Sequence, residues 1–384
     1  MNIAHSRTRG PRRRAVSLVL LSAALVSIGF MSGCGGGGSA GDEPARPDAP
    51  TASFLPLGAP AGHVTSEATA ISADGLAVAG TAKDATGREQ AFRWTVGAGF
   101  TALGFLPGGT RSTGADMSSD GSVVVGSADT SAMPTSSLTA FRWTATGGMQ
   151  RVAPLPSTVL CNGTAVSGDG QVVVGTCLGT NNTAFRWTEA TGPVSLGQFG
   201  GGLSAASTAS AISSDGQVIG GAGSPVLRGA MLWPFGQPPV TLGHLATGDT
   251  FASVSALSAD GGVAAGVSIG STGAARMFRW TVASGVTAIT GAPSDVTAMN
   301  VRALSASGAV LVGGWTRGGV ESAVIWDQAR GLRTLAQALT DERRLTLSGW
   351  TLQRANAISP DGRAIAGTGI NPQGVAEGWI VRLN

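Results

Sequence analysis

The sequence predicts an all-β fold, a seven-bladed β-propeller closed by an N-terminal strand. Three observations predict it. One unit recurs seven times between residues 52 and 384, each unit carries hairpin and strand signals, and the last unit lacks a strand that the start of the repeat region can supply. Self-similarity at a fixed period of this length is typical of propellers and other repeat folds.

A Ser-x-Asp-Gly turn and an aromatic pentapeptide mark each unit. The turn glycines are Gly75, Gly121, Gly170, Gly216, Gly261, Gly308 and Gly362, at intervals of 45 to 54 residues. The pentapeptide reads AFRWT at 91–95, 140–144 and 184–188, and MFRWT at 277–281. The repeats predict seven similar structural units in series.

Each unit predicts four short strands. Asp-Gly accepts positive φ and so favours a hairpin turn between two apolar stretches. The segment after the turn, such as SVVVG at 122–126, is β-branched and reads as a buried strand. In AFRW the Phe and Trp stand at i and i+2, on one face of a strand, where we expect them to pack against the following blade. A shorter strand such as TALG, 101–104, ends the unit.

The ends of the repeat region predict closure. The seventh copy stops at Asn384, before its last strand, whereas SFLPLG at 53–58 stands alone upstream of the first copy and resembles GFLPGG at 104–109. We expect the N-terminal strand to complete the last blade, which would remove the exposed sheet edges.

The N-terminus predicts export. A cluster of five arginines precedes an apolar run, 15–30, that is too short to span a membrane and suits a secretory signal. The following MSGC resembles a bacterial lipobox, which implies cleavage before Cys34 and acylation of that residue with palmitate-type chains, although Met31 stands where Leu is usual. We therefore expect a signal peptide over 1–33, a flexible Gly-rich tether over 34–51 and the propeller over 52–384. A plain signal peptide, and either general or twin-arginine export, stay open.

Charge excludes some partners. The chain has 25 basic and 22 acidic residues, and five of the basic ones lie in the signal segment, leaving 20 against 22 and a net charge of −2. No basic stripe remains for nucleic acid or an anionic bilayer. We expect a monomer in the cell envelope that meets the membrane only through its lipid, at the periplasmic or the extracellular side.

The two remaining cysteines predict a disulfide. Cys161 and Cys177 are equidistant from Asp169 of a hairpin turn, which places them opposite each other on neighbouring strands. An exported chain meets an oxidising compartment, so pairing is favoured over two free thiols.

The units resemble the HAF-family extracellular repeat of bacteria. The resemblance rests on ATAISADGLAVAG at 68–80, AFRWT at 91–95 and LGFLPGG at 103–109, and it covers nearly all of 53–384. It implies export and no established activity. Later copies depart from it, since AMLWP at 230–234 and AVIWD at 323–327 lack the Arg.

Few residues suggest chemistry, and the sequence assigns no catalytic, cofactor-binding or metal residue and no cofactor. His63 and His244 stand alone, without the neighbours that a metal site needs. A common turn role explains the aspartates better than calcium binding does; they are Asp74, Asp120, Asp169, Asp215, Asp260 and Asp361. The repeated arginines could form a ring for an anion, but we expect them to extend along the blade rim and pair with a carboxylate or backbone; they are Arg93, Arg142, Arg186 and Arg279.

A longer connection breaks the regularity late in the chain. Residues 335–359 carry an insertion with one short amphipathic helix that caps the ring, lines a groove or braces the closure.

The sequence favours an interaction scaffold that binds an unidentified protein, peptide or glycan. A polysaccharide-acting hydrolase or lyase of the envelope is the alternative, and a purely adhesive or structural component is a third.

Overall fold

A computed structural model describes residues 51–130, 138–158, 160–179, 181–197, 206–224 and 229–383. The chain divides into two compact units, Met1–Asp48 and Ala49–Asn384. The expected signal peptide over 1–33, Cys34 and the tether up to residue 50 lie outside the described residues. The following account concerns the second unit.

The described residues of this unit confirm the all-β prediction: they form 28 strands, a three-residue α-helix and one π-helical turn. The strands make five four-stranded antiparallel sheets and one eight-stranded sheet. The eight-stranded sheet consists of two four-stranded meanders, β6–β9 and β10–β13, which a single parallel bridge between Thr139 and Cys161 connects.

The first meander contains β2 (Thr65–Ile71), β3 (Ala77–Lys83), β4 (Glu89–Thr95) and β5 (Gly99–Ala102). The eight-stranded sheet contains β6 (Ser112–Met117), β7 (Val123–Ala128), β8 (Thr139–Thr144), β9 (Gly148–Arg151), β10 (Leu160–Val166), β11 (Val173–Leu178), β12 (Thr183–Thr188) and β13 (Gly192–Ser195). The next two contain β14 (Ala206–Ile212), β15 (Val218–Ser224), β16 (Gly229–Pro234) and β17 (Val240–Gly243), then β18 (Asp249–Leu257), β19 (Val263–Gly270), β20 (Ala275–Thr281) and β21 (Gly285–Ala288). The last two contain β22 (Val296–Leu304), β23 (Val310–Arg317), β24 (Val320–Asp327) and β25 (Gly331–Thr334), then β26 (Thr351–Ile358), β27 (Ala364–Ile370), β28 (Ala376–Leu383) and β1 (Ala52–Gly58).

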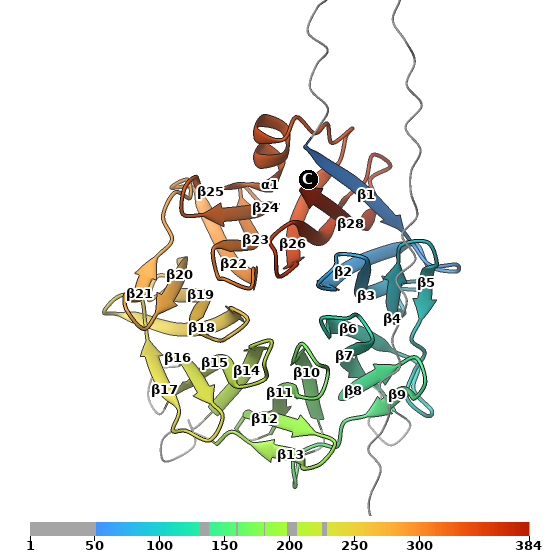
Figure 1. Cartoon of the computed structure of the whole chain (residues 1–384), viewed down its shortest axis with the longest axis vertical. Helices are drawn as coiled ribbons and strands as arrows, with labels where there is room; N and C mark the ends of the chain where they lie inside the picture. Colours follow the sequence, from blue (N-terminus) through green and yellow to red (C-terminus); the bar gives the residue numbers. More distant parts are fainter. Residues whose placement is uncertain are drawn as a thin grey trace, which may run out of the picture. The chain divides into compact units, whose positions relative to one another are not determined.

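The meanders stand around a central axis, with the first strand of each nearest to it (Figure 1). The last sheet has the order β1-β28-β27-β26, so its outer strand comes from the start of the repeat region. β1 pairs antiparallel with β28 from Ala52, opposite Leu383, to Gly58, opposite Gly378. The two ends of the repeat region therefore meet in one sheet.

A glycine within the second strand of a repeat makes room for the aromatic side chain beside it. Gly126 pairs with Phe141 across β7 and β8. A Cβ at Gly126 would lie 1.9 Å from the carbonyl oxygen of Thr113 and 3.0 Å from the Phe141 ring. Gly80 and Phe92 repeat this arrangement. The Val-Val-Gly pattern thus follows from close packing beneath a ring.

The aromatic pair faces the preceding sheet, so the expected packing against the following blade is wrong. Phe141 and Trp143 of β8 form one buried cluster with Ala70, Ala79 and Leu106 of the preceding repeat. The alternation of side chains correctly placed Phe and Trp on one face. Which neighbour that face meets depends on the direction in which the meanders follow each other around the axis.

The arginine between Phe and Trp points the other way and links its sheet to the next one. Arg93 Nε donates to the carbonyl oxygen of Gly121 at 2.6 Å, and Arg142 Nε donates to that of Gly170 at 3.1 Å. Both acceptors are glycines of the following turn. The arginines therefore bind backbone, one of the two partners expected from the sequence.

The predicted disulfide between Cys161 and Cys177 is present. The two residues are paired across β10 and β11, and both are buried in a cluster that includes Phe185. The hairpin register places them face to face, as their equal distance from the turn indicated.

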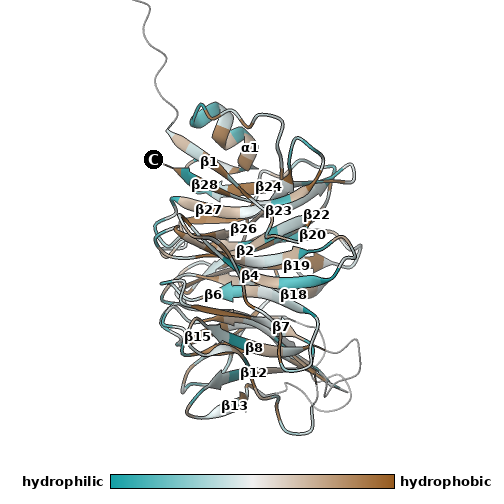
Figure 2. Cartoon of the chain, turned by 90° about the vertical axis from the view of Figure 1, so that its right-hand side faces the viewer, coloured by the Kyte–Doolittle hydropathy of each residue, from teal (hydrophilic) through white to brown (hydrophobic). Residues whose placement is uncertain are grey.

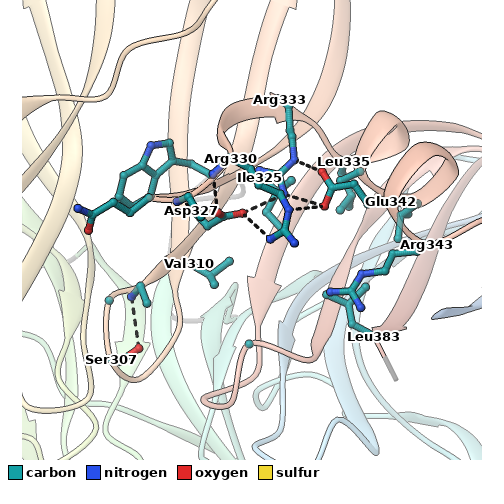
Figure 3. A pocket seen from close by; sticks show the side chains of 18 of the residues that line it. Ser307, Val310, Ile325, Asp327, Arg330, Arg333, Leu335, Glu342, Arg343 and Leu383 are labelled. Atoms are coloured by element: carbon teal, nitrogen blue, oxygen red, sulfur yellow. Dashed lines mark hydrogen bonds and ion pairs between the residues drawn. The ribbon is translucent and has the colours of Figure 1, made fainter. Parts of the chain in front are cut away.

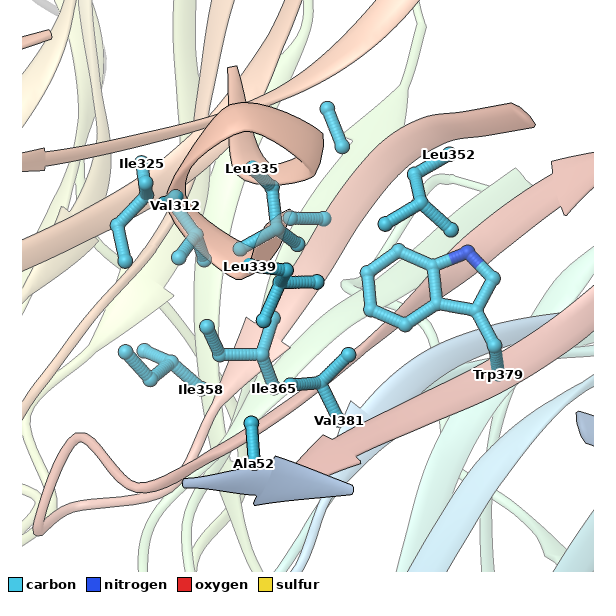
Figure 4. Close-up of a cluster of buried hydrophobic side chains, with 13 residues drawn as sticks. Ala52, Val312, Ile325, Leu335, Leu339, Leu352, Ile358, Ile365, Trp379 and Val381 are labelled. Atoms are coloured by element: carbon cyan, nitrogen blue, oxygen red, sulfur yellow. The ribbon is translucent and has the colours of Figure 1, made fainter. Parts of the chain in front are cut away.

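Figure 2 shows the strands from the side, with the insertion above them carrying both hydrophilic and hydrophobic residues. The insertion contains α1 (Leu335–Gln337) and the π-helical turn η1 (Ala338–Glu342). Thr334 caps α1 in a capping box with Gln337. Leu335 and Leu339 are fully buried in the cluster that joins β1 to β28 (Figure 4). The expected short amphipathic helix is confirmed, and it braces the junction of the two ends.

Candidate ligand-binding sites

A central channel of about 740 Å³ runs between the first strands of the sheets. Each inner strand contributes one residue from the same repeat position, and these residues are Thr69, Ala115, Thr164, Ser210, Ser255, Arg302 and Asn356. We call these seven residues a repeat column. Its side chains are small and mostly polar, but Arg302 is long and charged. The strands therefore repeat around the channel, while the side chains that line it differ from one strand to the next.

Arg302 gives the channel a positive sector. Its Nε donates to Asn300 Oδ1 at 3.2 Å, and it forms no ion pair within the described ranges. Burial, and then the neighbouring Arg354, lower the pKa of Arg302, while the charges of Glu321 and Glu67 act in the opposite direction. Arg354 itself donates to Glu321 Oε2 at 2.7 Å. One guanidinium therefore lines the channel without an ion pair among the described residues, although Glu67 lines the same channel.

The Ser-x-Asp-Gly turns draw together at one end of the channel. Backbone hydrogen bonds connect successive turns: Ala73 N to Ser119 O, Ser119 N to Gly168 O, Gly168 N to Ser214 O, Asp215 N to Ala259 O, Ala259 N to Ala306 O, and Ala306 N to Pro360 O. Pro360 has no N–H, so it cannot continue this series toward Ala73. Side chains join these two repeats instead, because Asn356 Nδ2 donates to Ala68 O at 2.7 Å and an Arg382 nitrogen donates to Gly75 O at 2.9 Å.

Asp116 brings a carboxylate to the channel wall. Its position holds alanine in the other six repeats: Ala70, Ala165, Ala211, Ala256, Ala303 and Ala357. Its two oxygens accept hydrogen bonds from Met117 N at 2.8 Å and from Val166 N, on the next meander, at 2.9 Å. Burial raises the pKa of Asp116 to about 6, although both hydrogen bonds act in the opposite direction.

We predict that Asp116→Ala stabilises the protein at neutral pH. The folded-state pKa lies above the ordinary value, so the contribution of Asp116 to stability is fully present at low pH and is lost as the pH rises through about 4 to 6. Above that range the charged form costs about 3 kcal/mol relative to the protonated form. The variant also loses the hydrogen bonds from Met117 and Val166, which offsets part of the gain. Urea unfolding at about pH 8 should show a gain of about 1 kcal/mol for the variant that vanishes near pH 4. A gain that grows as the pH falls would contradict this assignment.

The turn aspartates stabilise the turns by accepting hydrogen bonds from residues of the same turn. Ser72 Oγ donates to Asp74 Oδ1 at 2.6 Å, and Leu76 N donates to the same oxygen at 2.9 Å. The Ser72 hydrogen bond, and then the Leu76 one, lower the pKa of Asp74. The same Ser–Asp hydrogen bond recurs at Asp120, Asp169, Asp215, Asp260 and Asp361. The turn interpretation explains all six carboxylates.

The remaining arginines and histidines that the sequence analysis considered do not gather in one site. Arg279 Nε donates to Gly308 O at 3.3 Å, like its counterparts, whereas Arg186 lies 4.6 Å over the ring of Phe235. His63 lies in the loop between β1 and β2, and His244 follows β17. Three or more His, Cys, Asp or Glu do not gather at ligand distance anywhere in the part of the chain that the structure describes. Nor does that part contain a helix with the length and apolar character needed to cross a bilayer.

Sequence reasoning missed Asp116 and Arg302, although aligning the seven copies would have revealed both. Asp116 interrupts a column of alanines, and Arg302 interrupts a column of small residues. A departure from the repeat at an inner-strand position is the signal that was available.

The insertion lines a second cavity, of about 430 Å³, beside η1 (Figure 3). Arg333 lies at the centre of an ion-pair network on one wall. It binds Asp327 Oδ2 at 2.9 Å and also pairs with Glu342, while Arg330 approaches Glu342 Oε2 at 3.3 Å. Burial by itself lowers the pKa of Arg333, but the hydrogen bonds and charges of Glu342 and Asp327 together outweigh it and raise that pKa. The insertion therefore lines a groove as well as bracing the closure.

The fold resembles solved β-propeller structures. The chain is 14% identical to an oligogalacturonate lyase from Vibrio parahaemolyticus, with a TM-score of 0.55, covering 87% of this chain and 97% of that one. It is 9% identical to the β-propeller domain of the Trilobed protease from Pyrococcus furiosus, which has an open velcro topology, with a TM-score of 0.55 and coverage of 83% and 95%. TolB from Acinetobacter baumannii is 15% identical with a TM-score of 0.46, and the chain covers 63% of its length and 67% of its own.

The lyase and protease-domain likenesses, each with a TM-score of 0.55, confirm the β-propeller fold. At such low identity they show the fold alone. No family model matches the chain, and no curated protein matches it.

Proposed function

We propose that this protein is an exported, lipid-anchored, seven-bladed β-propeller that acts as a binding scaffold in the bacterial cell envelope. The central channel carries the proposal. Seven inner strands present different side chains around it, and Arg302 offers a guanidinium that forms no ion pair within the described ranges. Asp116 and Arg302, which depart from their repeat columns, both lie at the channel wall, and this supports a role in binding.

The seven-blade count and the closure belong to the same proposal. Seven turns in the sequence, together with the pairing of β1 and β28, support a ring in which the N-terminal strand completes the last blade. The export signal, Cys34 and the tether support a HAF-type lipoprotein held at a membrane by its lipid.

Channel occupancy can be tested in the cell by photo-crosslinking. A photoreactive amino acid replaces Ser210, whose side chain is exposed to the channel, and in a control replaces Val282, which is 85% exposed on an outer turn. We expect a discrete adduct from position 210, and its loss when Arg302→Ala is added. Identical adducts from both positions, or none from 210, would refute the channel as the binding site.

The lyase alternative has its own assay. The resemblance to an oligogalacturonate lyase favours oligogalacturonates as the test substrate. Elimination forms an unsaturated uronate that absorbs in the ultraviolet. An absorbance increase that Ser210→Trp abolishes and Val282→Trp preserves would replace the scaffold proposal with an enzyme.

Anchoring gives a further prediction. Cys34→Ala removes the thiol and the new N-terminal residue that a lipobox pathway acylates, so we expect the protein to leave the membrane fraction while remaining folded. Cell fractionation followed by immunoblotting measures the shift, and Ser39→Ala in the tether is the matched control. Membrane association that survives Cys34→Ala would show that the lipobox assignment is wrong.

A further inference from the structure

The cavity beside η1 lies where the repeat loses a carboxylate. In six of the seven repeats an aspartate precedes the turn glycine, whereas in the sixth repeat Ser307 takes its place. Ser307 and Gly308 line this cavity, as do residues of the insertion. In Figure 3, Ser307 and Val310 lie on one side, and Arg343 and Leu383 lie on the other. The channel and this cavity have no lining residue in common.

The missing carboxylate changes the surroundings of one of the repeated arginines. Arg93 and Arg142 each bind the glycine carbonyl of the next turn, directly after an aspartate. Arg279 makes the same contact with Gly308, but the residue before that glycine is Ser307. This arginine therefore lies beside a turn without a negative charge.

The cavity lining carries more positive than negative charge. Four arginines face two acidic residues, and these are Arg279, Arg330, Arg333 and Arg343 against Asp327 and Glu342. Both carboxylates already pair with Arg333 and Arg330. Neither Arg279 nor Arg343 forms an ion pair with a described residue. Guanidinium groups in a concave, partly desolvated site favour a carboxylate, which they can bind with two parallel hydrogen bonds.

Size and apolar surface define the rest of the ligand. About 430 Å³ is within the range of small-molecule pockets, and it is too small for a folded domain. Val310 and Trp326 contribute partly buried apolar surface to the same lining. A compact organic body with one acidic group matches this combination better than a bare inorganic anion does.

We propose that this cavity binds a small organic carboxylate, of the size of an acidic monosaccharide, whose acidic group takes the place of the turn carboxylate that the sixth repeat lacks. Arg279 and Arg343 balance its charge, and the insertion, which no other repeat has, forms one wall.

Titration calorimetry on the full chain at low ionic strength tests the proposal with sodium D-glucuronate as the probe. D-glucose serves as a sugar without the acidic group, and inorganic phosphate serves as an anion without the sugar. We expect saturable binding of glucuronate, and binding of glucose and phosphate that is at least about tenfold weaker. Ser307→Asp restores the carboxylate of the other six turns, so it should fold normally and weaken glucuronate binding about tenfold or more. Arg343→Gln should also weaken it.

Ala145→Asp is the matched control, because it adds the same charge to an exposed turn between β8 and β9, outside the cavity lining. It should leave binding unchanged. The proposal is overturned if glucuronate shows no saturable binding, if glucose or phosphate binds equally well, or if Ser307→Asp and Ala145→Asp have the same effect. Circular dichroism confirms that each variant is folded.

Discussion

Trp379→Ala is expected to destabilise the protein by about 3–5 kcal/mol, in the range of a large buried aromatic truncation. Trp379 is fully buried on β28, and its cluster joins β1, the insertion and the last sheet (Figure 4). Its ring centroid lies 6.3 Å from that of Phe54 on β1, and Phe54 makes an edge contact with Trp350 at 5.0 Å. Loss of the indole would leave a cavity where the two ends of the repeat region meet. Urea unfolding followed by far-ultraviolet circular dichroism measures the change.

Trp379→Phe is the matched control. Phenylalanine fills this slot in four other repeats, at Phe92, Phe141, Phe185 and Phe278. The indole Nε1 of Trp379 also has no hydrogen-bond partner among the described residues, so the smaller ring removes an unsatisfied buried donor. We expect a loss of about 1 kcal/mol or less. Equal losses for the two variants would show that this cluster does not hold the closure through the aromatic ring.

Removal of the disulfide is the second large effect expected. Cys161 and Cys177 are 16 residues apart, and a crosslink closing a loop of this length stabilises by about 3 kcal/mol, chiefly by restricting the unfolded chain. The double variant Cys161→Ala/Cys177→Ala should lose about that amount. Thermal or urea unfolding with and without reductant measures it.

Reductant supplies the internal control. Dithiothreitol should lower the stability of the wild-type protein toward that of the double variant and leave the variant unchanged. If reductant does not affect the wild-type protein, the disulfide contributes nothing to stability. Peptide mapping without reductant then decides the pairing directly, since an alkylatable Cys161 would mean that the bond does not form in the protein.

Much of the local structure could be predicted because each prediction depended on neighbours in the sequence. Asp74 and Gly75 specify a turn whichever sheet they join, and alternation places Phe92 and Trp94 on one face of β4. Likewise, the hairpin register alone brings Cys161 opposite Cys177. Hydrogen bonding and periodicity act over a few residues, so a repeated pentapeptide is enough to reveal them.

The candidate sites could not be predicted in the same way. Arg302 and Asp116 belong to strands more than a hundred residues apart in sequence, and they line one channel only because the inner strands converge on it. Ser307 was visible as a departure from the turn motif, but its meeting with the insertion and Arg279 depends on how the last three sheets are placed.

By itself, the sequence determined the all-β class, the repeating meanders, their turns and the disulfide register, because each follows from periodicity and short-range hydrogen bonding. Only the tertiary structure decided that the aromatic pair packs on the preceding sheet, that the arginines bind the following turn, and that unlike residues from distant repeats share a cavity. Those outcomes depend on the handed order of sheets around an axis. A side-chain period of two residues identifies a face of a strand but carries no information about which sheet that face will meet.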